Sequence, residues 1–317
     1  MSDFITIGEL LIDFTPSGEA DGQKLFMQNA GGAVANVAAA IAGFGISASF
    51  LGMVGNDVFG RYLAAVLQER GVDTSGLAMS DKYSTTLAFV HLSKNGERDF
   101  SFYRKPGADI MYSQDHLDIG AIKNARVFHF GSLSLTDEPA RSATFKALDI
   151  AKESGVVISY DPNYRKPLWK SEQEAKKYIT KGIAYADILK ISDNEASLLF
   201  RDIGHEDIAK ALVQKGVKLV FITLGSKGAI YANVSGTGIV KAFKANAVDT
   251  TGAGDCFTAA VLYRFIQSRK NLANLTLQDI GEFARFATAA ASVCVERMGG
   301  IPSMPDIAQV MQRLNRG

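Results

Sequence analysis

The sequence has little cysteine, no excess of charge of either sign and no long apolar run. Its 317 residues include two cysteines, Cys256 and Cys294, which are too few for a disulfide framework and have no histidine nearby at metal-ligand spacing. The 34 basic and 33 acidic residues nearly cancel, so no strong field favours a nucleic acid or an anionic membrane. No apolar run reaches the roughly 18–20 residues of a membrane span. Residues 1–4 also lack a basic, apolar leader, so we expect a cytoplasmic protein with no nucleic-acid or membrane partner.

Two common nucleotide-binding motifs are also missing. The sequence contains no G-x-x-x-x-G-K-[ST], which excludes a Walker-type phosphate loop. It has no G-x-G-x-x-G after its first predicted strand, which argues against an NAD-dependent dehydrogenase. The four histidines are scattered, and His129, inside a predicted strand, is expected to be a packed residue.

Short apolar runs alternate with helical patterns along most of the chain. Nearly continuous apolar runs, typical of strands buried on both faces, occur at 4–10, 47–54, 126–131, 156–160, 188–191 and 219–224. Helical patterns lie between them at 33–44, 58–70, 139–153, 171–184 and 208–215. Several of these end in glycine, which readily closes a helix: Gly45, Gly71, Gly155 and Gly216. The alternation predicts one α/β domain over 1–317, with a doubly wound, mostly parallel sheet flanked by helices.

Two segments, about 11–29 and 83–105, do not follow this rhythm. They alternate apolar and polar residues, the pattern of antiparallel strands with one wet face. Asn95-Gly96 lies between the second pair of strands and is a strong hairpin signal. We expect a small antiparallel β lid at one edge of the domain, although the same pattern also fits surface decoration.

The run from Asp249 to Asp255, Asp-Thr-Thr-Gly-Ala-Gly-Asp, is the most informative stretch. Its small residues permit close approach of the backbone, and the predicted start of the following helix presents unpaired N–H groups to an anion. Asp255 adds a carboxylate where an anion is expected to bind. As a helix cap it would need no such open backbone, although capping is a common role of aspartate. The alternative is a general base that takes the proton of a substrate hydroxyl beside a transferring phosphoryl group.

A second cluster, Gly31-Gly32-Ala33-Val34-Ala35-Asn36, opens an alanine-rich helical pattern. The glycines fit a tight turn, and the alanines fit close packing on a sheet. Asn36 is the one polar side chain between Gly32 and Ser47. A buried amide needs partners, and the hydroxyls of a sugar would supply them.

These two regions resemble the signatures of the ribokinase-like (PfkB-type) carbohydrate kinases, and the resemblance covers the whole chain. Within that family the chain is most similar to fructokinases in the four passages 8–14, 102–109, 128–134 and 159–169. The resemblance implies ATP-dependent phosphorylation of a sugar hydroxyl, D-fructose to fructose 6-phosphate, with ATP and Mg²⁺ as cofactors and K⁺ as an additional ion. It also implies a homodimer formed through the lid.

The resemblance assigns roles to individual positions. Asp255 would be the base, and Gly252, Ala253 and Gly254 would form the anion hole for the γ-phosphate. Sugar contacts would come from Asp13, Gly31, Gly32, Asn36, Tyr103, Arg104, Asn163 and Arg165. For Arg104, a solvated surface charge is the other expectation.

Nucleotide contacts would come from Ser192, Thr223, Gly225, Gly228 and Thr288. Glu195 would organise Mg²⁺ through water, because this ion keeps much of its hydration shell. Ser192 stands where an asparagine is commoner, which leaves its phosphate or metal role open. A monovalent cation would lie near Asp249, Thr251 and Ser303. Cys256 follows the base, where we expect a small packed residue, with redox sensitivity as the alternative.

Three other functions fit the same residues. A kinase of 2-keto-3-deoxygluconate would share the Tyr103-Arg104 pair and Arg165 but would need a carboxylate on its substrate. A ribokinase-type kinase would act on another sugar. A catalytically silent sugar- or nucleotide-binding regulator should have lost the base or the anion hole, and both are intact in this sequence.

Overall fold

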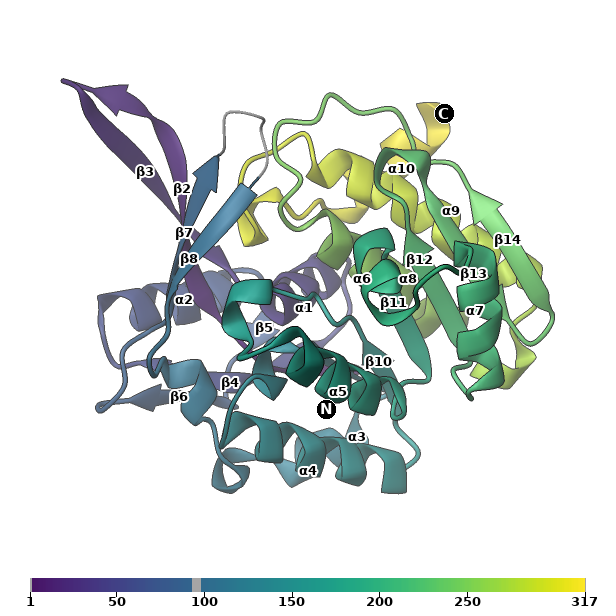
Figure 1. The fold of residues 1–317 in the computed structure, drawn as a ribbon, viewed down its shortest axis with the longest axis horizontal. Helices are drawn as coiled ribbons and strands as arrows, with labels where there is room; N and C mark the ends of the chain where they lie inside the picture. Colours follow the sequence, from purple (N-terminus) through teal and green to yellow (C-terminus); the bar gives the residue numbers. More distant parts are fainter. Residues whose placement is uncertain (1, 93–97, 317) are drawn as a thin grey trace.

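The computed structural model describes residues 2–92 and 98–316, and its main feature is a large sheet covered on both faces by helices (Figure 1). The strands of this sheet are β1 (Phe4–Ile7), β4 (Ala48–Gly55), β5 (Val72–Asp73), β6 (Leu77–Ser80), β9 (Val127–Phe130), β10 (Val157–Tyr160), β11 (Ile188–Ser192), β12 (Leu219–Thr223), β13 (Ala229–Asn233) and β14 (Gly236–Val240). Their order is β14-β13-β12-β11-β10-β9-β1-β4-β5, and β6 pairs with β4. All neighbours from β12 to β5 run parallel, whereas β13 and β14 are antiparallel.

Two layers of helices complete the body of the molecule. The helices are α1 (Ala33–Gly43), α2 (Val58–Glu69), α3 (Ile119–Asn124), α4 (Ala140–Glu153), α5 (Glu172–Ile183), α6 (Asp193–Leu199), α7 (His205–Gln214), α8 (Ala253–Ser268), α9 (Leu277–Cys294) and α10 (Ile307–Arg316). One apolar core joins the sheet to α1, α2, α8, α9 and α10, and a second joins it to α3–α7. Successive strand residues alternate between the cores, with Phe4 in the first and Ile5 in the second.

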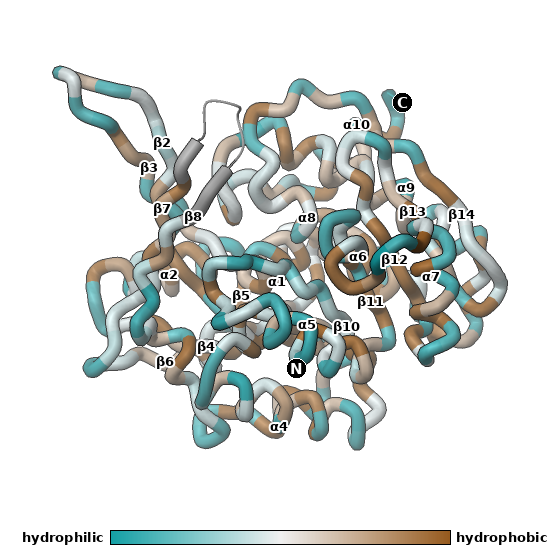
Figure 2. Tube along the Cα trace, viewed as in Figure 1, coloured by the Kyte–Doolittle hydropathy of each residue, from teal (hydrophilic) through white to brown (hydrophobic). Residues whose placement is uncertain are grey.

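A smaller sheet projects from the body, with strands β2 (Leu11–Ala20), β3 (Gln23–Gly31), β7 (Leu87–Leu92) and β8 (Arg98–Tyr103) in the order β3-β2-β7-β8 (Figure 1). We call it the side sheet. Its two hairpins are antiparallel, but β2 and β7, which join them, run parallel. Figure 2 shows hydrophilic residues at the far tip of β2–β3.

The predicted mostly parallel sheet and the small side sheet are confirmed. All six predicted strands are present, and the four glycines expected to close helices have positive φ angles of 71–106°. The edge strands β13 and β14 were not predicted, because their residues are only partly apolar. The Asn95-Gly96 hairpin signal lies outside the described residues.

None of the helices within residues 2–92 and 98–316 combines the length and apolar character of a membrane span.

Candidate active site

The first turn of α8 contains the residues predicted to bind an anion, and the N–H of Ala253 in this turn donates to the carbonyl of Thr250 over 3.3 Å. Gly252, with φ 78°, is the N-cap and makes no side-chain capping bond, and the helix begins at Ala253. Asp255 therefore lies inside the first turn, and the alternative that it caps the helix is wrong. Backbone N–H groups at such a start carry partial positive charge and attract anions. The carboxylate and the predicted anion hole thus belong to the same helical turn.

Two amides from distant parts of the chain orient the carboxylate of Asp255. Asn36, on α1, donates from Nδ2 to Oδ2 over 2.7 Å, and Asn163, in the loop after β10, donates to Oδ1 over 2.8 Å. Asn163 has φ 46°, a left-handed conformation that asparagine tolerates better than most residues. Asn36, which was predicted to bind sugar hydroxyls, therefore binds the carboxylate of Asp255 in this structure. Its Oδ1 is buried and lacks a partner within the described protein, so it can still accept a bond from a ligand.

Burial perturbs the two carboxylates that face this position. Burial and the negative charge of Asp161 raise the pKa of Asp255 to about 6, against the opposing effects of Asn36, Lys190 and Arg165. Burial also raises the pKa of Asp13 to about 7, where Arg165 opposes the rise and Asp255 adds to it. Both groups are still mostly ionised at pH 8, and Asp255 is then able to accept a proton.

Asp13 and the two glycines of the second cluster lie together. Asp13 is on β2 and is 8% exposed, and a Cβ added to Gly31 would overlap its Oδ2. Gly32, with φ 118°, is the N-cap of α1, and a Cβ there would overlap the carbonyl oxygen of Glu9. The glycines thus let the chain pass close to a carboxylate that is expected to bind the sugar.

Glu9 lies in the passage 8–14, and no role was predicted for it. Its Oε1 accepts a 2.6 Å bond from the amide of Ala33 at the start of α1. Burial raises the pKa of Glu9 to about 7, although backbone hydrogen bonds and Arg104 oppose this. Glu9 therefore holds the start of α1, and thereby Asn36, in place.

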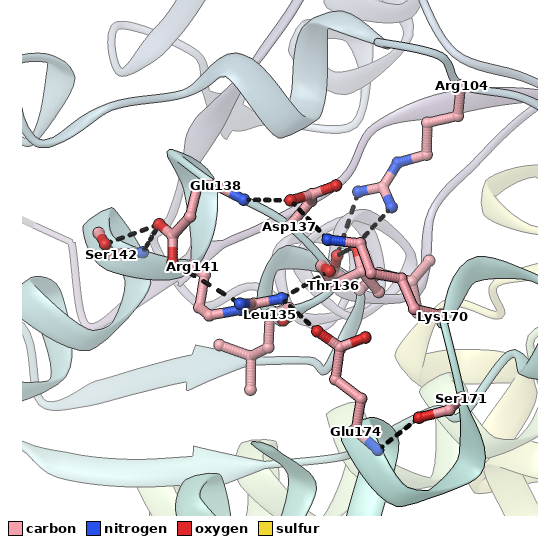
Figure 3. Close-up of polar contacts among 11 residues, drawn as sticks. Arg104, Leu135, Thr136, Asp137, Glu138, Arg141, Ser142, Lys170, Ser171 and Glu174 are labelled. Atoms are coloured by element: carbon pink, nitrogen blue, oxygen red, sulfur yellow. Dashed lines mark hydrogen bonds and ion pairs between the residues drawn. The ribbon is translucent and has the colours of Figure 1, made fainter. Parts of the chain in front are cut away.

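Arg104 is neither a solvated surface charge nor directed at Asp255. Its guanidinium is buried and donates to Asp109 Oδ2 over 2.7 Å, to Thr136 Oγ1 over 2.8 Å and to the carbonyl of Leu133 over 3.1 Å. Figure 3 shows it directed at the loop between β9 and α4, which Arg141 binds from the other side through the carbonyls of Leu135 and Thr136. Arg104 thus ties the end of β8 to this loop, and its sugar contact stays a prediction.

Tyr103 lies apart from the other predicted sugar contacts. It pairs with Leu87 at the end of β8, so the register places it on the opposite face of the side sheet from Asp13. Tyr103 is 67% exposed, and its ring contacts Phe89, which also contacts Phe14 and Phe26. The structure therefore does not bring Tyr103 to Asp255.

A buried ion pair beneath the anion hole was not predicted. Lys190, on β11, donates to Asp161 Oδ2 over 3.0 Å, and Thr258 of α8 donates to the same oxygen over 3.0 Å. A Cβ added to Gly254 would lie 2.7 Å from Lys190 Nζ. The signal in the sequence was a lysine in the otherwise apolar run Ile188-Leu-Lys-Ile191.

The expected nucleotide residues follow the neighbouring strands β11 and β12. Ser192 caps α6 and exchanges hydrogen bonds with Glu195 in a capping box. The Glu195 carboxylate accepts from the amide of Tyr164 over 2.7 Å and from the amide of Ser192 over 2.8 Å. The Ser192 hydroxyl also donates to Oε2 of Glu195 over 2.9 Å, so Oε1 alone keeps a free lone pair. One free lone pair fits contact with Mg²⁺ through water better than direct chelation.

Thr223 ends β12, and its hydroxyl lies 3.5 Å from the carbonyl of Ile191. Gly225 and Gly228 have positive φ angles, 57° and 107°, in the turn to β13. Thr288 is buried on α9, where its hydroxyl donates to the carbonyl of Arg285. Adenine and phosphate contacts of these residues stay predictions.

The three residues expected to hold a monovalent cation lie around one loop. Asp249 accepts from the amides of Thr251 over 2.7 Å and Gly299 over 2.9 Å. Ser303 Oγ lies 3.2 Å from Cys294 Sγ, which itself lies 4.0 Å from the carbonyl of Thr251. The described residues contain no group of three or more histidine, cysteine, aspartate or glutamate side chains arranged to hold a metal.

Comparison with known proteins decides the family. Residues 1–307 match the model of the pfkB family of carbohydrate kinases. The chain belongs to this family. It is 41% identical over 318 residues to Fructokinase-1 of Zea mays, covering 98% of this chain and 97% of the maize protein.

Solved structures of this family share the whole fold. Fructokinase from Xylella fastidiosa with bound ATP has a TM-score of 0.90 and 32% identity, covering 100% of this chain and 99% of that one. Fructokinase from Vibrio cholerae O395 with fructose, ADP and calcium has a TM-score of 0.89 and 30% identity, covering 99% of each chain. The predicted family and its α/β fold are therefore confirmed.

Proposed function

We propose that this PfkB-family kinase transfers the γ-phosphate of ATP to the 6-hydroxyl of D-fructose. The observation that carries the proposal is the carboxylate of Asp255, held by Asn36 and Asn163 in the same helical turn as an uncapped N-terminus. The fructokinases named above, one with ATP and one with fructose and ADP, support both substrates.

The geometry supports an in-line transfer with Asp255 as base. The sugar oxygen forms a bond to the γ-phosphorus, the bond from that phosphorus to the leaving ADP oxygen breaks, and the hydroxyl proton passes to Asp255. The backbone N–H groups of Gly252, Ala253 and Gly254 would stabilise the charge that develops on the phosphoryl group, and that of Ala253 would exchange its 3.3 Å bond to the carbonyl of Thr250 for this contact. Asp13, Gly31, Gly32, Asn36 and Asn163 line the sugar side, and Arg165 supplies positive charge beside both aspartates.

ATP and Mg²⁺ are the cofactors of these kinases. When bound, Mg²⁺ neutralises phosphate charge, and Glu195 would hold its water shell. We also propose that Ser192, Thr223, Gly225, Gly228 and Thr288 contact the nucleotide. The loop of Asp249, Thr251 and Ser303 is proposed to hold K⁺, an ion bound in a fructokinase variant from V. cholerae.

The chain is proposed to act as one domain. Its side sheet would serve as a lid that excludes water from the site, because water would otherwise compete with the sugar as nucleophile. On one face of this sheet the ring of Phe89 contacts the rings of Phe14, Phe26 and Tyr103. Exposed aromatic clusters are typical of protein interfaces, so we propose that a second copy of the chain covers this face in a homodimer. Sedimentation of wild type and Phe26→Glu tests this, because the variant should be monomeric and wild type dimeric.

The test of the activity is ADP release from MgATP with fructose, ribose, 2-keto-3-deoxygluconate, glucose and adenosine, for wild type and Asp255→Asn. Highest kcat/KM on fructose, lost in the variant, supports the substrate and the base. Preference for the keto-acid or for ribose would keep the mechanism and overturn the substrate. Binding of ATP without turnover of any sugar would favour the regulator.

A further inference from the structure

Lys190 is a charged residue in the middle of the large sheet. Its neighbours on β11, Leu189 and Ile191, are fully buried apolar residues, and the lysine side chain itself is only 8% exposed. An apolar residue at this position would extend the core without removing a charge from water. Buried ion pairs commonly stabilise a fold no better than apolar residues of similar size. Stability alone therefore gives no reason for this lysine.

The ammonium group of Lys190 lies between the anion hole and the core. It contacts Gly254 so closely that a Cβ there would lie 2.7 Å from Nζ and 3.5 Å from Cε. Its bonded partner, Asp161, begins the loop that carries Asn163, and Asn163 binds Asp255. Thr258, one turn after Gly254 on α8, binds the same oxygen of Asp161. The ion pair therefore connects the anion hole, the loop after β10 and the catalytic carboxylate.

Titratable groups from several elements face Asp255 and affect its protonation. They are Asp13 on β2, Asp161 and Arg165 after β10, Lys190 on β11, and the thiols of Cys256 and Cys294. Burial lowers the pKa of Lys190, but Asp161, Glu195 and Asp255 outweigh burial and raise it, so Lys190 stays a cation. Without it, Asp161 would leave an unbalanced negative charge beside the base.

We propose that Lys190 is a positioning residue for phosphoryl transfer, because its ammonium group places positive charge behind the anion hole and holds Asp161 beside the catalytic carboxylate. The inference rests on the proposed function of Asp255 as base. Nζ of Lys190 lies 2.7 Å from where a Cβ on Gly254 would be. Lys190 therefore acts through its electric field at this turn and through the loop that orients Asn163.

The kinetic test compares Lys190→Met with the charge-preserving Lys190→Arg. We measure kcat and KM for fructose from pH 5 to 9 at saturating MgATP. For Lys190→Met we expect the midpoint of the acidic limb of kcat to rise by about one pH unit or more, because a positive charge near Asp255 is lost. We expect kcat at pH 8 to fall at least about tenfold and KM to stay unchanged. Lys190→Arg should restore the midpoint.

A second variant separates charge from folding. Lys190→Met/Asp161→Asn removes both charges of the pair, so the protein keeps no unpaired buried carboxylate. Its acidic midpoint should return towards the wild-type value, whereas kcat at pH 8 should stay low because the positive charge behind Gly254 is missing. A wild-type midpoint in folded Lys190→Met, or full kcat in the double variant, would overturn the proposal.

A measurement without substrate keeps this inference separate from the proposed function. The free energy of unfolding in urea is measured from pH 4 to 9 for two pairs of proteins. One pair is wild type and Asp255→Asn, and the other is Lys190→Met and Lys190→Met/Asp255→Asn. The pH range over which the unfolding free energies within a pair diverge reports the titration of Asp255. We expect this range to move upward in the Lys190→Met pair, and identical ranges would refute the inference even if wild type phosphorylates another sugar.

Discussion

Replacing Asp255 by asparagine is expected to stabilise the fold while removing most of the activity. Burial first, and then Asp161, raise the pKa of Asp255 from 3.8 to about 6 in the folded protein. Each pKa unit corresponds to 1.36 kcal/mol, so the ionised carboxylate costs the folded state about 3 kcal/mol at pH 8. Asparagine has the same shape and carries no charge. Its amide nitrogen can donate to Oδ1 of Asn36, which has no other partner in the described protein, once the Asn36 amide turns over, so both contacts of the side chain are kept.

The sign follows from proton binding. Between about pH 4 and pH 6 the folded protein holds a proton on Asp255 that the unfolded chain has released, so stability falls as pH rises through this range. Asp255→Asn does not lose stability in this way, because it has no carboxylate to ionise. Its free energy of unfolding should therefore exceed that of wild type by about 3 kcal/mol at pH 8 and by roughly half as much at pH 5.

Two assays check the prediction on the same samples. Urea denaturation followed by circular dichroism gives the free energy of unfolding at each pH, and ADP release gives kcat. Loss of a general base lowers kcat about 10²- to 10⁴-fold. A difference in unfolding free energy that does not change between pH 5 and pH 8 would refute the assignment of a raised pKa. A kcat close to that of wild type would refute the role as base.

Three further replacements test other parts of the site. Gly31→Ala places a methyl group against Asp13, so the KM for fructose should rise at least about tenfold while the KM for ATP stays unchanged in steady-state assays. Arg104→Met leaves Asp109 buried and unpaired, and should lower the free energy of unfolding by about 3–5 kcal/mol in urea titrations. Adding Asp109→Leu should recover most of that loss, and no recovery would contradict the pairing. Asp57→Ala removes the N-cap of α2 and should cost about 1–2 kcal/mol at pH 7 without changing kcat.

The sequence was sufficient for the fold because its local signals agree with the tertiary structure. The apolar runs of β1, β4, β9, β10, β11 and β12 are buried on both faces, as such runs predict. The side sheet was predictable from alternation, but its parallel junction between β2 and β7 was not, because alternation does not report which strands pair or in which direction.

The candidate site was predictable only where a motif is continuous in the chain. The Gly-Ala-Gly run and Asp255 follow one another, so their common turn could be foreseen. The bonds of Asp255 to Asn36 and Asn163 join residues separated by 219 and 92 positions, and no local pattern encodes such a contact. Arg104 shows the same limit, since its partners Leu133 and Thr136 come from the loop after β9.

The separation of 219 positions between Asn36 and Asp255 also affects biosynthesis. At typical translation rates a ribosome needs about 10–45 s to reach Asp255 after adding Asn36. During that interval α1, whose residues 34–41 are all buried in the finished protein, has no α8 to pack against. A nascent chain therefore exposes an alanine- and valine-rich helix to other proteins before it has the carboxylate of Asp255, the proposed base. Chaperones that bind apolar segments would meet this kinase while it is still inert.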